Sequence, residues 1–239
     1  MSDPTYSRVL LKLSGEALAG ERGFGIEPEV VDRLTDEIKA IAAMGVSLGL
    51  VIGGGNIVRG AMASQKGMDR VQADYMGMLS TVINALAVQD LLERKGVETR
   101  VMTAIRMDEI AEPYIRRRAM RHMEKGRVVL FAAGTGNPYF STDTAAVLRA
   151  IEMESEVVIK ATKVQGVYTA DPAKDPDAEF LPTVSYHEVM TRELAVMDAA
   201  AVSLCKENDL PIIVLNLENR GTVVSAIRGD HVGTFVSGN

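Results

Sequence analysis

The chain has 239 residues, of which 47% are hydrophobic, 24% are charged and only 5% are aromatic, and its formal net charge is -6. This composition predicts a globular protein rich in aliphatic packing, and the acidic balance argues against a nucleic-acid partner, because such partners select a basic surface. The single cysteine, Cys205, excludes an internal disulfide, and no apolar run reaches the roughly 18 residues of a membrane span, so we expect a cytoplasmic protein with no membrane contact.

Short apolar runs alternate with helical patterns along the chain. Strands are predicted over residues 9–13, 48–52, 100–104, 128–132, 157–161 and 212–216. Helices are predicted over residues 28–44, from about 72 to 95, and over 144–151, with Pro28 in the first turn of one and Gly96 as the C-terminal cap of another. Apolar strands separated by helices predict an α/β fold with a mostly parallel central sheet covered on both faces. Ligands of such sheets bind at the carboxyl ends of the strands.

The first predicted strand carries a lysine in apolar surroundings, one residue before its end. Lys12 follows Val9, Leu10 and Leu11 and precedes Leu13, so its ammonium group would be buried at a cost unless it meets an anion. The alternative is an edge strand from which the lysine reaches solvent.

Three glycines follow the second predicted strand. Gly53, Gly54 and Gly55 leave the backbone bare, and Arg59 comes shortly after them. Such a turn serves as an anion site through its N–H groups, allows another part of the molecule to approach closely, or does both. A purely structural turn remains the alternative.

A second glycine-containing turn, residues 133–143, follows the fourth predicted strand and opens into a helix. Its hydroxyl and amide groups suit an anion, whereas Asp143 is either a functional carboxylate or a cap of the helix. Lys160 and Lys163 follow the fifth strand, ahead of a loop over residues 166–172.

Two anion turns and several cations at neighbouring strand ends favour two phosphate-bearing ligands in one cleft. That arrangement suits phosphoryl transfer, in which positioning and neutralisation of charge supply most of the catalysis. Neither a GxxxxGK[ST] phosphate loop nor a GxGxxG dinucleotide fingerprint occurs in the chain.

Six segments together resemble the bacterial uridylate kinase branch of the amino-acid kinase family, over nearly the whole chain. They are KLSGEAL (12–18), VIGGGN (51–56), GMLSTVINALA (77–87), AGTGNPYFSTD (133–143), KATKVQGVYTADPAKDP (160–176) and VMD (196–198). GGGN is common to the wider family, whereas DYMGML (74–79) and GTGNP are specific to this branch. The resemblance implies a three-layer α/β/α sandwich in one domain over residues 1–239, with UMP bound mainly by the N-terminal part and ATP by the C-terminal part.

The resemblance also implies a transferase that phosphorylates UMP to UDP with ATP and magnesium, in pyrimidine nucleotide biosynthesis. Catalytic roles would fall to Lys12, Asp143, Lys160 and Asp198, with the two aspartates as organisers of lysines and magnesium waters. Lys12, Arg59 and magnesium would neutralise the transferred phosphoryl group. The ATP side would comprise Lys12, Leu13, Ser14, Gly15, Gly55, Arg59, Thr162, Tyr168 and Asp171. The UMP side would comprise Gly54, Asp74, Thr135, Gly136, Asn137, Pro138, Tyr139, Phe140, Ser141 and Thr142. No direct metal ligand is expected, because magnesium would bind through the nucleotide phosphates.

Regulation and assembly are implied in the same way. The loop Gly20, Glu21, Arg22, Gly23, Phe24 and Gly25 matches a segment associated with GTP activation, although an ordinary connection would look the same; UTP would inhibit. The apolar helix positions Met76, Leu79, Val82, Ile83 and Leu86 favour a symmetric interface within a homohexamer, or simply core packing. Gln165 stands where the family commonly has an acidic residue, and we expect it to change contacts of the nucleotide loop without loss of activity.

Two other classes stay open. A carboxylate or carbamate kinase of the same family is one, and it would need a cationic grip for its substrate. A nucleotide-binding or storage protein without catalysis is the other, against which the joint presence of Lys12, Asp143, Lys160 and Asp198 argues.

Overall fold

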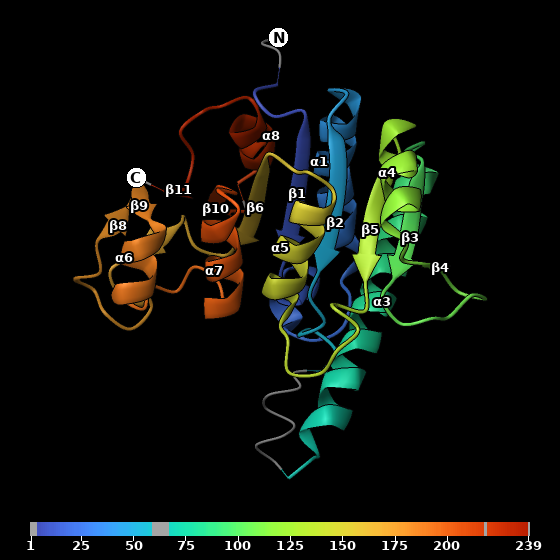
Figure 1. The fold of residues 1–239 in the computed structure, drawn as a ribbon, viewed down its shortest axis with the longest axis horizontal. Helices are drawn as coiled ribbons and strands as arrows, with labels where there is room; N and C mark the ends of the chain where they lie inside the picture. The colour runs from blue at the N-terminus through green and yellow to red at the C-terminus, as the bar shows by residue number, and fades with distance from the viewer. Residues whose placement is uncertain (1–3, 59–66, 218, 239) are drawn as a thin grey trace.

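The computed structural model describes residues 4–58, 67–217 and 219–238, and its main feature is one twisted sheet (Figure 1). In the described residues nine strands join in the order β4-β3-β5-β2-β1-β6-β10-β11-β9. Their bounds are β1 Arg8–Leu13, β2 Ser47–Ile52, β3 Thr99–Thr103, β4 Glu112–Pro113, β5 Val128–Ala132, β6 Val157–Thr162, β9 Thr183–Ser185, β10 Ile212–Asn216 and β11 Thr234–Ser237. All pairs are parallel except β10 with β11, and β7 (Val167–Tyr168) pairs separately with β8 (Phe180–Leu181). The six predicted strands are all present.

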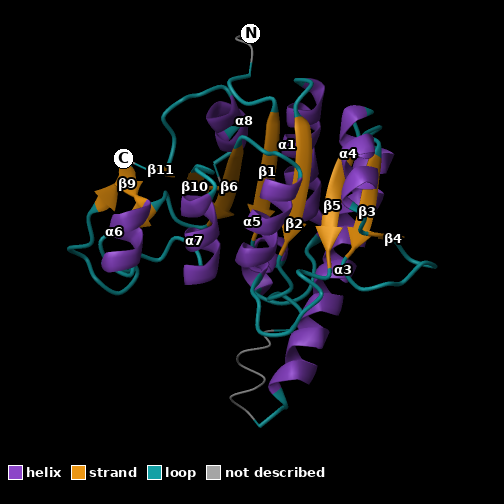
Figure 2. Ribbon diagram, viewed as in Figure 1, coloured by secondary structure: helices purple, strands orange, loops and turns teal. Residues whose placement is uncertain are grey.

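Helices cover both faces of this sheet (Figure 2). One layer holds α1 (Pro28–Ala43), α3 (Arg70–Arg94) and α8 (Thr222–Ile227), and the other holds α4 (Arg116–Glu124), α5 (Thr142–Glu152), α6 (Tyr186–Thr191) and α7 (Ala199–Glu207). Two short 3-10 turns, η1 (Gly15–Leu18) and η2 (Gly20–Arg22), connect β1 to α1. The α/β fold with a mostly parallel sheet between helical layers is therefore confirmed.

The central strand β1 shows how the two layers share the sheet. Val9, Leu11 and Leu13 pack into the core beneath α1 and α3, whereas Leu10 packs into the core beneath α5 and α7. Since side chains alternate along a strand, Lys12 faces the same layer as Leu10. β1 lies between β2 and β6 and Lys12 is 7% exposed, so the alternative of an edge-strand lysine reaching solvent is wrong.

Local signals set the helix ends close to their predicted positions. Pro28 begins α1, and α3 ends at Arg94, two residues before Gly96 with its positive φ of 81°. Helix α5 begins at Thr142 rather than 144, because the Ser141 hydroxyl accepts hydrogen bonds from the backbone N–H groups of residues 143 and 144. The cap of α5 is thus Ser141, and the reading of Asp143 as the cap is wrong.

Helix α3 is long and apolar. Over the described part of the chain it alone has the length and mean hydropathy of a membrane-spanning helix, although 44% of the most apolar window is buried in the fold, and core helices of globular proteins meet the same criterion. Met76, Leu79 and Ile83 are between 41% and 50% exposed, while Val82 is buried and Leu86 is partly buried. The helix therefore presents an apolar stripe to solvent.

Candidate active site

Three buried charges form the centre of the site. The parallel register places Lys12 of β1 beside Lys160 of β6 on the same face of the sheet. Asp143, in the first turn of α5, lies against both ammonium groups, with 2.6 Å between its Oδ1 and Lys12 Nζ and 2.8 Å between its Oδ2 and Lys160 Nζ. Lys160 also donates a hydrogen bond to the carbonyl oxygen of Val196, at 2.6 Å. Neighbouring like charges are tolerated here because a carboxylate lies between them.

Burial and neighbouring charges shift the pKa values of Asp143 and Lys160. Burial would raise the pKa of Asp143, but the charges of Lys12 and Lys160 and their hydrogen bonds outweigh it and hold the pKa below its ordinary value of 3.8. Burial lowers the pKa of Lys160 below 10.5, against the attraction of Asp143 and Asp198. With both lysines charged, the group keeps one excess positive charge in a site largely closed to water.

Asp198 accepts hydrogen bonds from two hydroxyl groups and one backbone N–H. It is the N-cap of α7 and accepts the backbone N–H of Ala201 at 3.0 Å. Its carboxylate also accepts hydrogen bonds from the hydroxyls of Ser141 and, at 2.9 Å, Thr144. Asp198 therefore ties the start of α5 to α7, and its charge acts on Lys160 from a distance.

Glycine is required in the turns after β1 and β2 because the backbone of other segments leaves no room for a side chain. A Cβ atom on Gly15 would lie 2.5 Å from the carbonyl oxygen of Gly53, and one on Gly54 would lie 2.6 Å from the carbonyl oxygen of Gly77 in α3. The Gly53 N–H also donates to the carbonyl oxygen of Leu13, at 2.9 Å. Close approach of other backbone thus accounts for Gly15 and Gly54, and a Cβ atom on Gly53 would lie only 3.0 Å from the backbone nitrogen of Gly15. Arg59 lies outside the described residues.

A smaller cavity of about 220 Å³ opens between the glycine turn after β2, α3 and the second glycine turn, which precedes α5. Seven residues of the predicted UMP side line it: Gly54, Asp74, Thr135, Tyr139, Phe140, Ser141 and Thr142. Gly136, Asn137 and Pro138 belong to the same turn but do not line the cavity.

Asp74 is fixed at the wall of this smaller cavity by two donors. Arg70, one helical turn earlier in α3, donates through Nε to both carboxylate oxygens at 2.9 and 2.8 Å, and the Tyr139 N–H donates at 2.7 Å. The Arg70 guanidinium also lies 5.5 Å from the Tyr139 ring centroid. Tyr139 has a φ of 73°, and Ala133 at the start of the turn has 62°, which are strained values for residues with a side chain. The contacts of Tyr139 with Asp74 and Arg70 hold the turn in this strained conformation.

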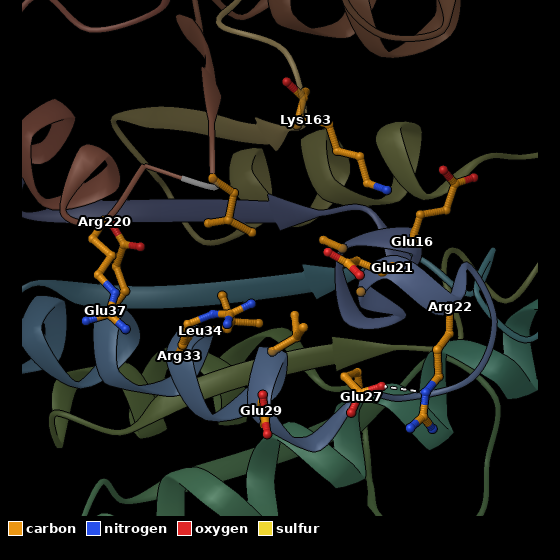
Figure 3. Close-up of a pocket in the computed structure, with 15 residues that line it drawn as sticks. Glu16, Glu21, Arg22, Glu27, Glu29, Arg33, Leu34, Glu37, Lys163 and Arg220 are labelled. Carbon is orange, nitrogen blue, oxygen red and sulfur yellow. Dashed lines mark ion pairs between the residues drawn. The ribbon is translucent and has the colours of Figure 1, made fainter.

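A larger cavity of about 750 Å³ lies between α1, the η1–η2 segment and the ends of β6 and β10 (Figure 3). Thr162 and Lys163 line it, together with Gly20, Glu21 and Arg22 of the predicted regulatory loop. Arg33, Glu37 and Arg220 lie toward one end, and Lys163 extends toward Glu16 at the other.

The predicted ATP-side residues are spread more widely. Lys12, Leu13, Ser14 and Gly15 come together with the charged centre, and Thr162 Oγ1 donates to the carbonyl oxygen of Val164 at 2.8 Å. Tyr168 packs edge to face on Phe180 with 5.6 Å between centroids, and Asp171 pairs with Lys174 at 3.1 Å. Neither Tyr168 nor Asp171 lines either cavity.

Sequence reasoning missed several contributors to the site. Arg70 was recognisable only by its spacing of four residues before Asp74. Thr81 donates its hydroxyl to the helix and accepts the Ala133 N–H at 2.8 Å, which fixes the second turn against α3. Asn56 and Asn84 form a buried amide pair that no local pattern indicates. Among the residues described, no group of three or more His, Cys, Asp or Glu side chains is placed to hold a metal ion.

Comparison with known proteins gives one consistent result. The family model described as "Amino acid kinase family" matches residues 7–216. The fold is similar to UMP kinase from Bacillus anthracis (TM-score 0.94, 41% identity, covering 97% of this chain and 96% of that one). It is also similar to UMP kinase from Ureaplasma parvum (TM-score 0.91, 36% identity, 97% and 98%) and to uridylate kinase from Archaeoglobus fulgidus (0.75, 26%, 96% and 99%).

Proposed function

The chain belongs to the amino acid kinase family, and from this premise we propose that it transfers the γ-phosphoryl group of ATP to UMP, giving ADP and UDP. The names of the similar structures and the resemblance of six sequence segments support a nucleoside monophosphate kinase. The observation that carries the proposal is the buried group of Lys12, Asp143 and Lys160, with its excess positive charge, next to a cavity lined by the predicted UMP residues.

The proposed reaction needs little covalent help from the protein. A phosphate oxygen of UMP, already anionic at neutral pH, attacks the γ-phosphorus of ATP, and the bond to the oxygen bridging the β- and γ-phosphorus breaks as ADP leaves. No general base is required for such a nucleophile. Lys12 and Lys160 neutralise charge on the transferred group, and Asp143 holds both ammonium groups in place.

The two nucleotides occupy different sides of this centre in the proposal. UMP binds in the smaller cavity, where Asp74, fixed by Arg70, accepts hydrogen bonds from the ribose hydroxyls. ATP lies with its phosphates at Lys12 to Gly15, with Gly55 and Arg59 on the same side, and with its nucleoside toward Thr162, Tyr168 and Asp171.

Magnesium enters the proposal as part of the nucleotide substrate. Asp143 faces two lysines and Asp198 accepts from two hydroxyls and an N–H, so both carboxylates already have partners. This suits a cation that is bound mainly through phosphate oxygens, where it would neutralise charge between the β- and γ-phosphates.

Regulation and assembly form a second part of the proposal. We expect a cytoplasmic homohexamer built from dimers, with the exposed stripe Met76, Leu79 and Ile83 of α3 in a symmetric interface. GTP would activate through residues 20–25 and UTP would inhibit. Sedimentation velocity tests the assembly, and a monomer at micromolar concentration would contradict it.

A substrate panel tests the activity. The protein is incubated with ATP and magnesium plus UMP, CMP, glutamate or carbamate, and nucleotides are separated and quantified. UDP formation with the highest kcat/KM for UMP is expected. Higher efficiency with glutamate or carbamate would favour a carboxylate or carbamate kinase, and ATP binding without any product would favour a non-catalytic nucleotide-binding or storage protein.

A further inference from the structure

Two asparagines form a reciprocal amide pair in the interior of the protein. Asn56, directly after the glycine turn that follows β2, and Asn84, in the middle of α3, are 1% and 0% exposed. Asn56 Nδ2 donates to Asn84 Oδ1 at 3.0 Å, and Asn84 Nδ2 donates to Asn56 Oδ1 at 2.7 Å. Each amide nitrogen has a second proton, and each finds a backbone acceptor elsewhere.

The second protons join three segments that are distant in the sequence. Asn84 Nδ2 donates to the carbonyl oxygen of Gly53 at 2.7 Å, which links α3 to the glycine turn. Asn56 Nδ2 donates to the carbonyl oxygen of Gly25 at 2.7 Å, and the Gly25 N–H returns a bond to the Asn56 carbonyl oxygen at 2.8 Å. The pair therefore satisfies all four amide protons while connecting α3, the turn and the segment before α1.

The carbonyl oxygen of Gly53 is also the point where the turn after β1 meets the glycine turn after β2. A Cβ atom on Gly15 would lie 2.5 Å from this oxygen and 2.6 Å from Asn56 Oδ1, so the turn after β1 rests directly on the pair. Any shift of Gly53 or Asn56 would displace the backbone of residues 14 and 15, just beyond Lys12. Such a displacement would slow the reaction, because phosphoryl transfer depends on the alignment of the two reacting groups.

We propose that Asn84 is a positioning residue: it touches neither nucleotide and fixes, through Gly53 and Asn56, the spacing between the turn after β1 and the glycine turn after β2, which flank the phosphates. Its kinetic consequence rests on the proposed UMP kinase activity. Leucine has nearly the shape of asparagine but cannot donate to Gly53 or pair with Asn56. Asn84→Leu therefore removes the link and keeps the volume.

The matched control is Thr35→Val. Thr35 is also fully buried in a long helix, but its hydroxyl donates only to the carbonyl oxygen of Asp32 in the same helix, at 2.8 Å. Both variants lose a buried hydrogen-bonding group, and only Asn84→Leu loses a link to the turn. Steady-state kinetics are measured with UMP and ATP at a temperature where melting curves show each variant folded.

For Asn84→Leu we expect kcat to fall about tenfold to hundredfold while KM for each nucleotide changes less than about threefold. Thr35→Val should keep kcat within about twofold of the parent. Hydrogen exchange of the backbone amides of residues 53–58, followed by mass spectrometry without nucleotide, should accelerate about tenfold in Asn84→Leu and stay unchanged in Thr35→Val.

Two results would overturn the positioning role: an unchanged kcat in folded Asn84→Leu, or unchanged exchange at residues 53–58. If the parent protein forms no UDP, the proposed activity fails, and the exchange measurement alone then decides whether Asn84 fixes the turn. If Asn84→Leu does not fold, Asn84→Ser, whose hydroxyl is too short to reach Gly53, is judged by the same criteria.

Discussion

Two carboxylates at this site each accept hydrogen bonds from a cation, yet their surroundings differ in burial and in net charge. Asp143 lies between Lys12 and Lys160, and none of the three side chains is more than 18% exposed. Asp74 is paired with Arg70, whose side chain is 41% exposed, and with the backbone of Tyr139. The first group has one positive charge in excess, whereas the second is neutral.

This difference separates two tasks. An excess charge held away from water attracts an anion strongly, because desolvation reduces screening. A neutral pair at a cavity wall adds no net attraction for phosphate, but its carboxylate oxygens accept hydrogen bonds from hydroxyl groups at a fixed position. The buried group therefore suits charge neutralisation, and the Arg70–Asp74 pair suits recognition.

The largest expected effect comes from removing the carboxylate of the buried group. Asp143→Asn leaves two neighbouring ammonium groups without their counter-charge, so the free energy of unfolding should fall by about 3–5 kcal/mol. Chemical denaturation measures it. The control, Asp36→Asn, removes a carboxylate that is 66% exposed and leaves Lys95 paired with Asp32, so it should change stability much less. Equal losses in both variants would show that the buried group has no special role.

The next effect concerns the ammonium group of Lys12. Lys12→Met keeps the length of the side chain and removes the charge, so kcat should fall about a hundredfold or more, equivalent to about 2.7–4 kcal/mol. Kinetics with UMP and ATP are paired with a ligand-free melting curve, and the exposed Lys39→Met is the control. A normal kcat would shift the role to Arg59, Lys160 or Lys163.

A smaller effect is expected at the neutral pair. Asp74→Asn weakens charge-assisted acceptance from the ribose, so UMP binding should lose about 1–3 kcal/mol while ATP affinity stays nearly unchanged. Calorimetric titration with each nucleotide measures both. Asp90→Asn is the matched control, because Asp90 pairs with Arg94 in the same helix at the same four-residue spacing. Equal losses for UMP and ATP would contradict the assignment of sides.

The smallest effect is the pH dependence of the buried group. The pKa of Asp143 is lowered from 3.8 in the folded state, so its stabilisation is present above pH 3.8 and is lost as the pH falls through the folded value. Melting temperatures from pH 5 down to pH 2.5 should therefore fall more steeply in the parent than in Asp143→Asn. Parallel curves would show that Asp143 does not titrate as the charges around it require.

The sequence predicts those parts of the molecule that depend on local pattern. Apolar runs located the six main strands within a residue or two, because burial on both faces leaves an unbroken apolar signal. Strands of two or three residues, such as β4 and β9, are too short to show an apolar run or an alternation of apolar and polar residues, and none of them was predicted. Of the predicted helix starts, that of α1 at Pro28 is confirmed, whereas α3 and α5 each begin two residues earlier than predicted, α5 because Ser141 is its N-cap.

For the site, the sequence indicated that Lys12 needs an anion but not which one. The pairing with Asp143 depends on where α5 crosses the strands, which is a property of the whole fold. The same holds for Arg70 and Asn84, which are ordinary helix residues until the turns they contact are in place. The positive φ of Tyr139 likewise has no local cause, since glycine would be the expected residue there.

The position of β1 in the sheet has a consequence for how the chain is made. Residues 8–13 emerge early in synthesis and pair with β2 some 40 residues later, but their other partner, β6, begins only at Val157. Throughout that interval the strand that carries Lys12 has an open edge, and such edges pair readily with other chains. A nascent chain that ends before β6 should therefore depend on chaperones to stay unaggregated.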